Sequence, residues 1–140
     1  MSFNLTTINW LAVLAAAFAT FMLGGAWYTA LFGKAWMKAH GYDEATMKDL
    51  QARRPPPVFF TMMIVAYFFV ALAMAIIVQS ADIRGADNGA LLGFALWVIV
   101  AAITLTNHIP THVTWVGYFI DTSYSLIYCL GAGATLGAWR

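Results

Sequence analysis

Four long apolar stretches, separated by shorter polar connections, dominate the pattern of the chain. The expected helices cover residues 10–32, 58–79, 90–109 and 118–139. Each reaches the roughly 20 helical residues that cross a hydrocarbon core about 30 Å thick. Asp121 is the one formally charged side chain within them, whereas a helix on the surface of a soluble protein normally has a charged face. The pattern predicts an all-α fold, an integral membrane bundle of four transmembrane helices.

The composition favours the same interpretation and limits the number of domains. Of the 140 residues, 62% are hydrophobic and 9% are charged, against about 25% charged residues in a typical soluble domain. Four spans and one loop occupy nearly the whole chain, so we expect a single membrane domain, surrounded by the lipid bilayer, over residues 1–140. The net charge of +1 lacks the basic excess that nucleic-acid binding requires, so nucleic acid is not an expected partner.

The distribution of basic residues between the loops predicts the orientation. The loop 33–57 holds five of the seven Lys and Arg residues, and the opposite side holds Arg84 and Arg140. Because loops rich in Lys and Arg stay in the cytoplasm, we expect loop 33–57 to be cytoplasmic and both termini to lie outside. The expected location is the inner membrane of a bacterium, crossed several times.

The loop 33–57 also predicts local structure. Residues 34–40 are expected to continue the first helix into the headgroup layer, with Gly41 as the stop. Asp43 is a candidate N-cap for a short interfacial helix that ends near Ala52. The three prolines 55–57 suit the first turn of the second span, where backbone N–H groups have no helical partner. This loop is either a docking surface for a partner or anionic lipid, or a solvated connector whose charges set the topology.

Small residues recur at four-residue spacing on three of the expected spans. In lipid, such residues mark the faces where helix backbones approach closely. These ladders either build the monomer or join copies into an oligomer. The candidate packing residues are Ala16, Thr20, Gly24, Gly89, Gly93, Gly133 and Gly137.

The fourth expected span has a polar stripe around its charged residue. Asp121, Tyr124, Ser125 and Tyr128 fall at positions i, i+3, i+4 and i+7, which share one helix face. Ionisable groups inside a span are costly, so Asp121 is a candidate partner for an ion, a proton or a small ligand along a hydrophilic path. The alternative is structural, because a carboxylate near a helix start caps free N–H groups.

A second polar cluster ends the third expected span. Asn107, His108 and His112 gather there, and the two histidines have the i, i+4 spacing of some helical metal sites. Pro110 lies between them and disfavours helical geometry, and no Cys, Glu or third His stands nearby to complete a closed site. We therefore expect neither a metal nor another cofactor. The histidines are better interpreted as boundary residues that change charge between about pH 5 and 8, on the same side as Asp121.

Several sequence segments resemble one family of bacterial membrane proteins. They are residues 8–13 (INWLAV), 23–28 (LGGAWY), 31–37 (LFGKAWM), 120–124 (IDTSY) and 136–139 (LGAW). Together they make the chain similar to the family called domain of unknown function 1761. The resemblance implies a small four-helix protein of a bacterial inner membrane, and it carries no catalytic residue. The matching positions, for which it implies helix packing and interface anchoring, are Asn9, Gly24, Trp27, Tyr28 and Trp36.

Three classes of function are compatible with these patterns. The first is a non-enzymatic structural or interaction protein that self-associates or joins a larger membrane complex, favoured by the small-residue ladders and the lack of a complete catalytic constellation. The second is a small oligomeric channel or transporter that uses the Asp121 stripe. The third is a redox- or quinone-linked membrane protein that uses His108 or His112.

Overall fold

The computed structural model describes residues 5–140, and every regular element in that part of the chain is helical. The all-α prediction is therefore confirmed. The elements are η1 (Leu5–Thr7), α1 (Trp10–Gly25), η2 (Ala26–Leu31), α2 (Gly33–Ala39), α3 (Glu44–Arg53), α4 (Pro56–Ser80), α5 (Ala86–His108) and α6 (Trp115–Ala138).

Three helical segments are long and apolar enough to cross a membrane, not the four that the sequence predicts. They are Trp10–Leu31, which combines α1 and η2, together with α4 and α5. Helix α6 has 24 residues and is long enough, but its residues 121–125 form an uninterrupted polar run of Asp, Thr, Ser, Tyr and Ser. The expectation of four transmembrane helices was therefore wrong, because those polar side chains make α6 less apolar than the other three long helical segments.

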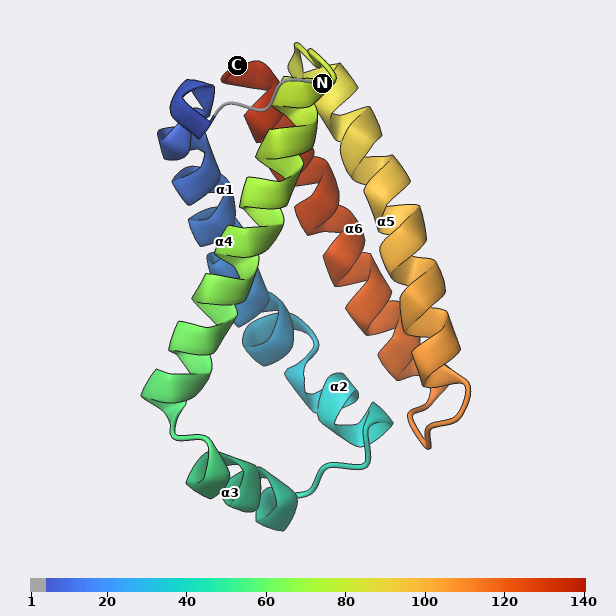
Figure 1. Cartoon of the computed structure of the whole chain (residues 1–140). Helices are drawn as coiled ribbons and strands as arrows, with labels where there is room; N and C mark the ends of the chain where they lie inside the picture. The colour runs from blue at the N-terminus through green and yellow to red at the C-terminus, as the bar shows by residue number, and fades with distance from the viewer. Residues whose placement is uncertain (1–4) are drawn as a thin grey trace.

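The helices form an elongated bundle in which α6 occupies an inner position (Figure 1). Helix α6 packs against α1, α2, α4 and α5, whereas α5 packs almost entirely on α6. The start of α1 and the end of α6 lie at one end of the bundle, and α2 and α3 lie at the other (Figure 1). Around the termini, the Asn9 side-chain amide donates to the Trp139 carbonyl at 2.7 Å, and Arg140 pairs with Asp82 at 2.8 Å.

The core between α1, α4 and α6 is built mainly from small and medium side chains. Ala16 and Thr20, two of the candidate packing residues, are buried on the α1 face that meets α4 and α6. Small residues allow the helix axes to approach, so dispersion contacts replace the hydrophobic effect that lipid does not supply. The buried apolar residues are Ile8, Ala12, Val13, Ala16, Ala17, Ala71, Met74, Ala75, Val78, Ala132 and Leu136.

Helices α5 and α6 meet through what we call the glycine seam, formed by Gly89, Gly93, Gly133 and Gly137. A Cβ atom added at Gly89 would overlap the Gly133 carbonyl, and one added at Gly93 would overlap the Cys129 carbonyl. Backbone therefore lies directly on backbone along this contact. The Gly85 N–H group also donates to the Gly137 carbonyl at 3.0 Å, which fixes the register at the end of the seam. In this chain the four glycines pack helices of the same molecule.

The first helix does not continue straight into the loop as the sequence predicts. It changes to π-helical geometry in η2 and breaks at Phe32, whose φ of −120° and ψ of 4° leave the helical region. Helix α2 then packs against α6 and brings Trp36 to Asp121. The sequence expectation fails because Trp36 gains a hydrogen bond inside the protein, which an extended helix at the headgroups would not provide.

The predicted helix stop at Gly41 and the predicted helix cap at Asp43 agree with the structure. Helix α2 ends before Gly41, whose φ of +69° suits a residue without a side chain. Two backbone bonds, from Gly41 to the Lys38 carbonyl and from Tyr42 to the Met37 carbonyl, complete a Schellman motif. Asp43 caps α3 and accepts from the Thr46 backbone at 2.7 Å. This capping and a second bond from the Thr46 hydroxyl hold the pKa of Asp43 below its usual value.

Candidate functional site

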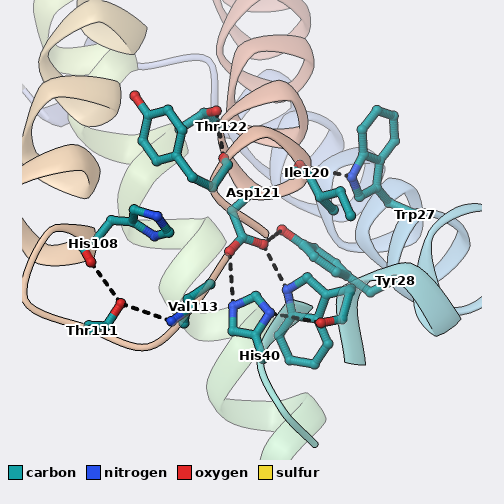
Figure 2. Close-up of polar contacts among 11 residues, drawn as sticks. Trp27, Tyr28, His40, His108, Thr111, Val113, Ile120, Asp121 and Thr122 are labelled. Carbon is teal, nitrogen blue, oxygen red and sulfur yellow. Dashed lines mark hydrogen bonds and ion pairs between the residues drawn. The ribbon is translucent and has the colours of Figure 1, made fainter. Parts of the chain in front are cut away.

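Asp121 lies inside α6 and is not its cap. The helix begins at Trp115, with Thr114 in the N-cap position, so Asp121 stands more than one turn from the start. Its carboxylate faces the α2 side of the bundle, where η2 and α2 supply three partners (Figure 2). Of the structural interpretation of Asp121, helix capping is therefore wrong, whereas structural hydrogen bonding is seen, because the carboxylate joins separate elements.

The Asp121 cluster consists of Tyr28, Trp36, His40 and Asp121. One carboxylate oxygen, Oδ1, accepts the Tyr28 hydroxyl and the Trp36 indole N–H, each at 2.9 Å. The other, Oδ2, pairs with His40 Nε2 at 3.4 Å, and His40 Nδ1 lies 2.9 Å from the Trp36 carbonyl. The side chains of His40 and Asp121 are 13% and 31% exposed. The charge is thus held by neutral donors and one imidazole at the edge of the bundle.

Three tryptophans from three different elements donate to one turn of α6. Trp27 of η2 donates to the Ile120 carbonyl at 3.1 Å, and Trp97 of α5 donates to the Thr122 carbonyl at 2.8 Å. Between these two contacts, Trp36 of α2 donates to Asp121. An indole N–H can only donate and usually finds an acceptor when buried. The three indoles therefore fix η2, α2 and α5 around the same turn, a role that membrane-interface placement does not predict.

Tyr124 connects this turn of α6 to α1. Its hydroxyl donates to the Thr20 carbonyl at 2.9 Å. The contact depends on Gly24, where an added Cβ would lie 2.8 Å from that hydroxyl. The Tyr124 ring also packs against Trp27, Tyr28, Tyr67 and Tyr128, with centroid separations from 5.2 to 6.3 Å. An aromatic layer therefore lies directly beside the Asp121 cluster.

The other stripe residues make contacts within the protein. The Ser125 hydroxyl donates to the Thr122 carbonyl of its own helix at 2.9 Å, and the Tyr128 ring contacts Tyr67 of α4. Neither residue bonds to Asp121 in the part of the chain that the structure describes. The stripe is a set of local contacts that hold helices together.

The second predicted cluster does not join Asp121. Helix α5 ends at His108, so the i, i+4 helical spacing to His112 is not formed. His108 packs against the rings of Trp115 and Tyr118 at 5.1 and 5.4 Å, whereas Asn107 and His112 are exposed. Over residues 5–140, no group of three or more His, Cys, Asp or Glu side chains has a metal-binding arrangement.

His40 is the residue of the site that the sequence pattern did not single out. It follows a short helix and stands 81 positions before Asp121, so no local periodicity links the two. Two contacts bring it there: the Thr114 N–H donates to the Ala39 carbonyl at 3.0 Å, and Gly117 leaves space for the ring. The sequence signal that could have pointed to His40 was Gly41, the glycine of the Schellman motif that ends α2 directly after His40.

The chain was compared with models of known protein families. The family model described as protein of unknown function (DUF1761) matches residues 11–137. The chain belongs to the DUF1761 family. Comparison of this DUF1761 chain with curated proteins and with solved structures gives no match. The matched range contains the Asp121 cluster, the three indole donors and the glycine seam, so the site described above lies within the family region.

Proposed function

We propose that this DUF1761 chain is a non-enzymatic integral membrane protein that acts by association, either with copies of itself or with a larger membrane complex. The observation that carries this proposal is a contrast between the inside and the outside of the bundle. Polar side chains of α6 bond to neighbouring elements or to their own helix. The outward faces of α4 and α5 are apolar.

The inner polar groups hold structure and are not arranged for turnover. Asp121 already receives two hydrogen bonds and an imidazole contact. A catalytic carboxylate needs room for a reacting group within hydrogen-bond reach. The neighbouring hydroxyls of Tyr124 and Ser125 donate to backbone carbonyls. The geometry supports a role in fixing helices.

The outer surface offers apolar area for helix contacts. Helix α4 packs on α1 and little on α5, and an open groove of about 340 Å³ lies where α1 meets α4. Leu14 and Phe18 of α1 and Ile64, Val65 and Phe68 of α4 line that groove. Large apolar patches on a protein surface mark contacts with lipid or protein partners. The most exposed large side chains of α4 and α5 are Phe60, Met62, Phe69, Leu91, Ile99 and Ile103.

The proposed setting is the inner membrane of a bacterium, with the α2–α3 end in the cytoplasm. The five basic residues of loop 33–57 support this orientation. The start of α1 and the end of α6 lie together at the opposite end of the bundle (Figure 1), as expected if both termini are outside. A reporter attached after Arg140 is expected to read out on the external side. A cytoplasmic readout would overturn the orientation.

Native mass measurement in nanodiscs tests the association itself. The protein, extracted from its own membrane in mild detergent, is expected to give a mass above that of one chain of 15.3 kDa. Cross-linking in intact membranes, before extraction, is the matched measurement, because detergent can separate weak assemblies. A single free chain in both measurements would overturn the proposal.

A small channel or transporter is the second candidate, and the partial exposure of Asp121 favours it. In that case Asp121→Asn changes ion or proton flux in proteoliposomes, because it removes a charge from the path. The control is Ser123→Ala, which alters an exposed polar residue of the same turn. Equal flux in the parent and in Asp121→Asn would remove the carboxylate from any transport mechanism.

A further inference from the structure

His40 is held in a fixed place between α2 and α6. The Schellman motif that ends α2 sets the backbone around it, and the Thr114–Ala39 backbone bond fastens that end of α2 to the start of α6. A Cβ atom at position 117 would lie 3.1 Å from His40 Cε1, so the ring lies close to the α6 backbone at Gly117. With 13% of its side chain exposed, the imidazole has little freedom to turn away.

Both ring nitrogens of His40 face groups that can only accept a proton. Nδ1 lies 2.9 Å from the Trp36 carbonyl oxygen, and Nε2 lies 3.4 Å from Asp121 Oδ2 (Figure 2). A neutral imidazole has one N–H donor, whereas an imidazolium has two. The neutral ring therefore satisfies one contact and turns a lone pair toward the other acceptor. The doubly protonated ring satisfies both.

The surroundings of the pair supply two further donors to the carboxylate. Asp121 Oδ1 accepts hydrogen bonds from Tyr28 and Trp36, so Oδ2 is the carboxylate oxygen that faces His40. Tyr28 from η2 is the other titratable group at the carboxylate, and Tyr42 packs on the imidazole. The cations Lys34 and Lys38 of α2 and the side chain of His112 are exposed.

We propose that the His40–Asp121 pair is a proton-binding site that fastens the α2 segment to α6. With the proton bound, His40 bridges the Trp36 carbonyl and the Asp121 carboxylate. Without it, the Nε2 lone pair opposes the carboxylate, and α2 keeps only the Trp36 indole and the Thr114–Ala39 bond to α6. Loss of this proton removes one polar contact between α2 and α6, so the proposal predicts that the stability from this contact is present at low pH and is lost at high pH.

Nitrogen NMR of the full-length protein in detergent micelles tests this assignment directly. The chain has three histidines, so labelling with ¹⁵N-histidine gives the signals of three imidazole rings. At pH 7.5, the His40 ring is expected to carry a proton on both nitrogens. Variants His108→Gln and His112→Gln assign the signals by elimination, so the assignment does not depend on any variant at position 40. A His40 ring with a single proton at this pH would overturn the proposal.

Thermal unfolding supplies a second readout with a matched control. Between pH 6 and pH 9, the melting temperature of the parent protein is expected to fall by about 3 °C more than that of the His40→Gln variant. Glutamine keeps a neutral donor toward Asp121 and cannot titrate. His112→Gln, which alters an exposed histidine, is expected to keep the parent pH dependence. A His40→Gln profile that matches the parent would also overturn the proposal.

Discussion

Two contacts of α6 with its neighbours use different physics. Along the glycine seam, α5 lies on α6 backbone to backbone, and the absence of side chains makes the contact possible. At the opposite end of the bundle, η2 and the α2 segment reach α6 through a hydroxyl, an indole and an imidazole that gather around one carboxylate. The seam depends on shape, and the Asp121 cluster depends on hydrogen bonds and an imidazole contact. Steric changes should therefore damage the first, and chemical changes the second.

The contrast also explains which part of the molecule can respond to conditions. The four glycines of the seam carry no titratable side chain, so solution pH has no direct influence on that contact. The Asp121 cluster contains a carboxylate and an imidazole and is partly exposed. Under the proposed proton binding by His40 and Asp121, protonation alters how α2 is held while α5 and α6 stay together. The four changes below test this division from the largest expected effect to the smallest.

Replacing Gly93 by valine should have the largest effect. The added Cβ overlaps the Cys129 carbonyl on α6, so the two helices must separate, and overpacking of this kind costs about 3 kcal/mol. A marked fall in the melting temperature in micelles is expected. Gly131→Val is the matched control, because a Cβ at Gly131 meets nothing within 4 Å. Equal losses in the two variants would contradict a tight seam.

Replacing Asp121 by alanine should come next. It removes the acceptor of the Tyr28 hydroxyl and the Trp36 indole, and leaving such donors unpaired costs about 2 kcal/mol. The loss should appear as a lower unfolding temperature and as faster amide exchange in α2, with the α5–α6 amides unchanged. Ser123→Ala is the control on the same turn of α6. Uniform exchange changes across the bundle would argue against a local role.

Replacing Gly24 by alanine should have a smaller effect. The new methyl group would lie 2.8 Å from the Tyr124 hydroxyl, which must then leave the Thr20 carbonyl, at a cost of about 1 kcal/mol for the hydrogen bond. Gly25→Ala is the neighbouring control, since a Cβ there meets nothing within 4 Å. Calorimetric unfolding of both variants measures the difference. A Gly24→Ala protein as stable as Gly25→Ala would show that Tyr124 is free to move.

Replacing Asp43 by alanine should have the smallest effect and should be confined to α3. The pKa of Asp43 is lowered by its bonds with Thr46, so its contribution is present above the ordinary carboxyl range and is lost as pH falls through the lowered pKa. Amide exchange of residues 44–53 measures it. Asp43→Asn keeps a capping side chain that does not titrate, so its α3 should show no acid-induced loss from this position.

The local signals in the sequence predicted the helices well. The stretch expected at 58–79 became α4 at Pro56–Ser80, with proline in its first turn. The stop at Gly41 and the cap at Asp43 were also confirmed. These features depend on hydropathy over one helix, on the φ angle of a single residue or on a hydrogen bond across three residues. All of that information lies within a short length of chain.

The errors concern contacts between distant parts of the chain. The fourth expected span is less apolar than its neighbours, and the chain breaks at Phe32 after η2 instead of extending the first helix. His40 was overlooked because its partner lies 81 residues away. The hydrogen bond from the Trp36 indole N–H to the Asp121 carboxylate was also not predicted.

By itself, the sequence determined that the chain is helical, roughly where its long helices lie, and which of its residues are small enough for close packing. Only the tertiary structure decided which helices meet and which acceptors the indoles, hydroxyls and imidazole reach. The physical reason is range. Helical hydrogen bonds and hydropathy act over a few residues of chain, whereas a buried donor takes whatever acceptor the packing of the whole bundle brings to it.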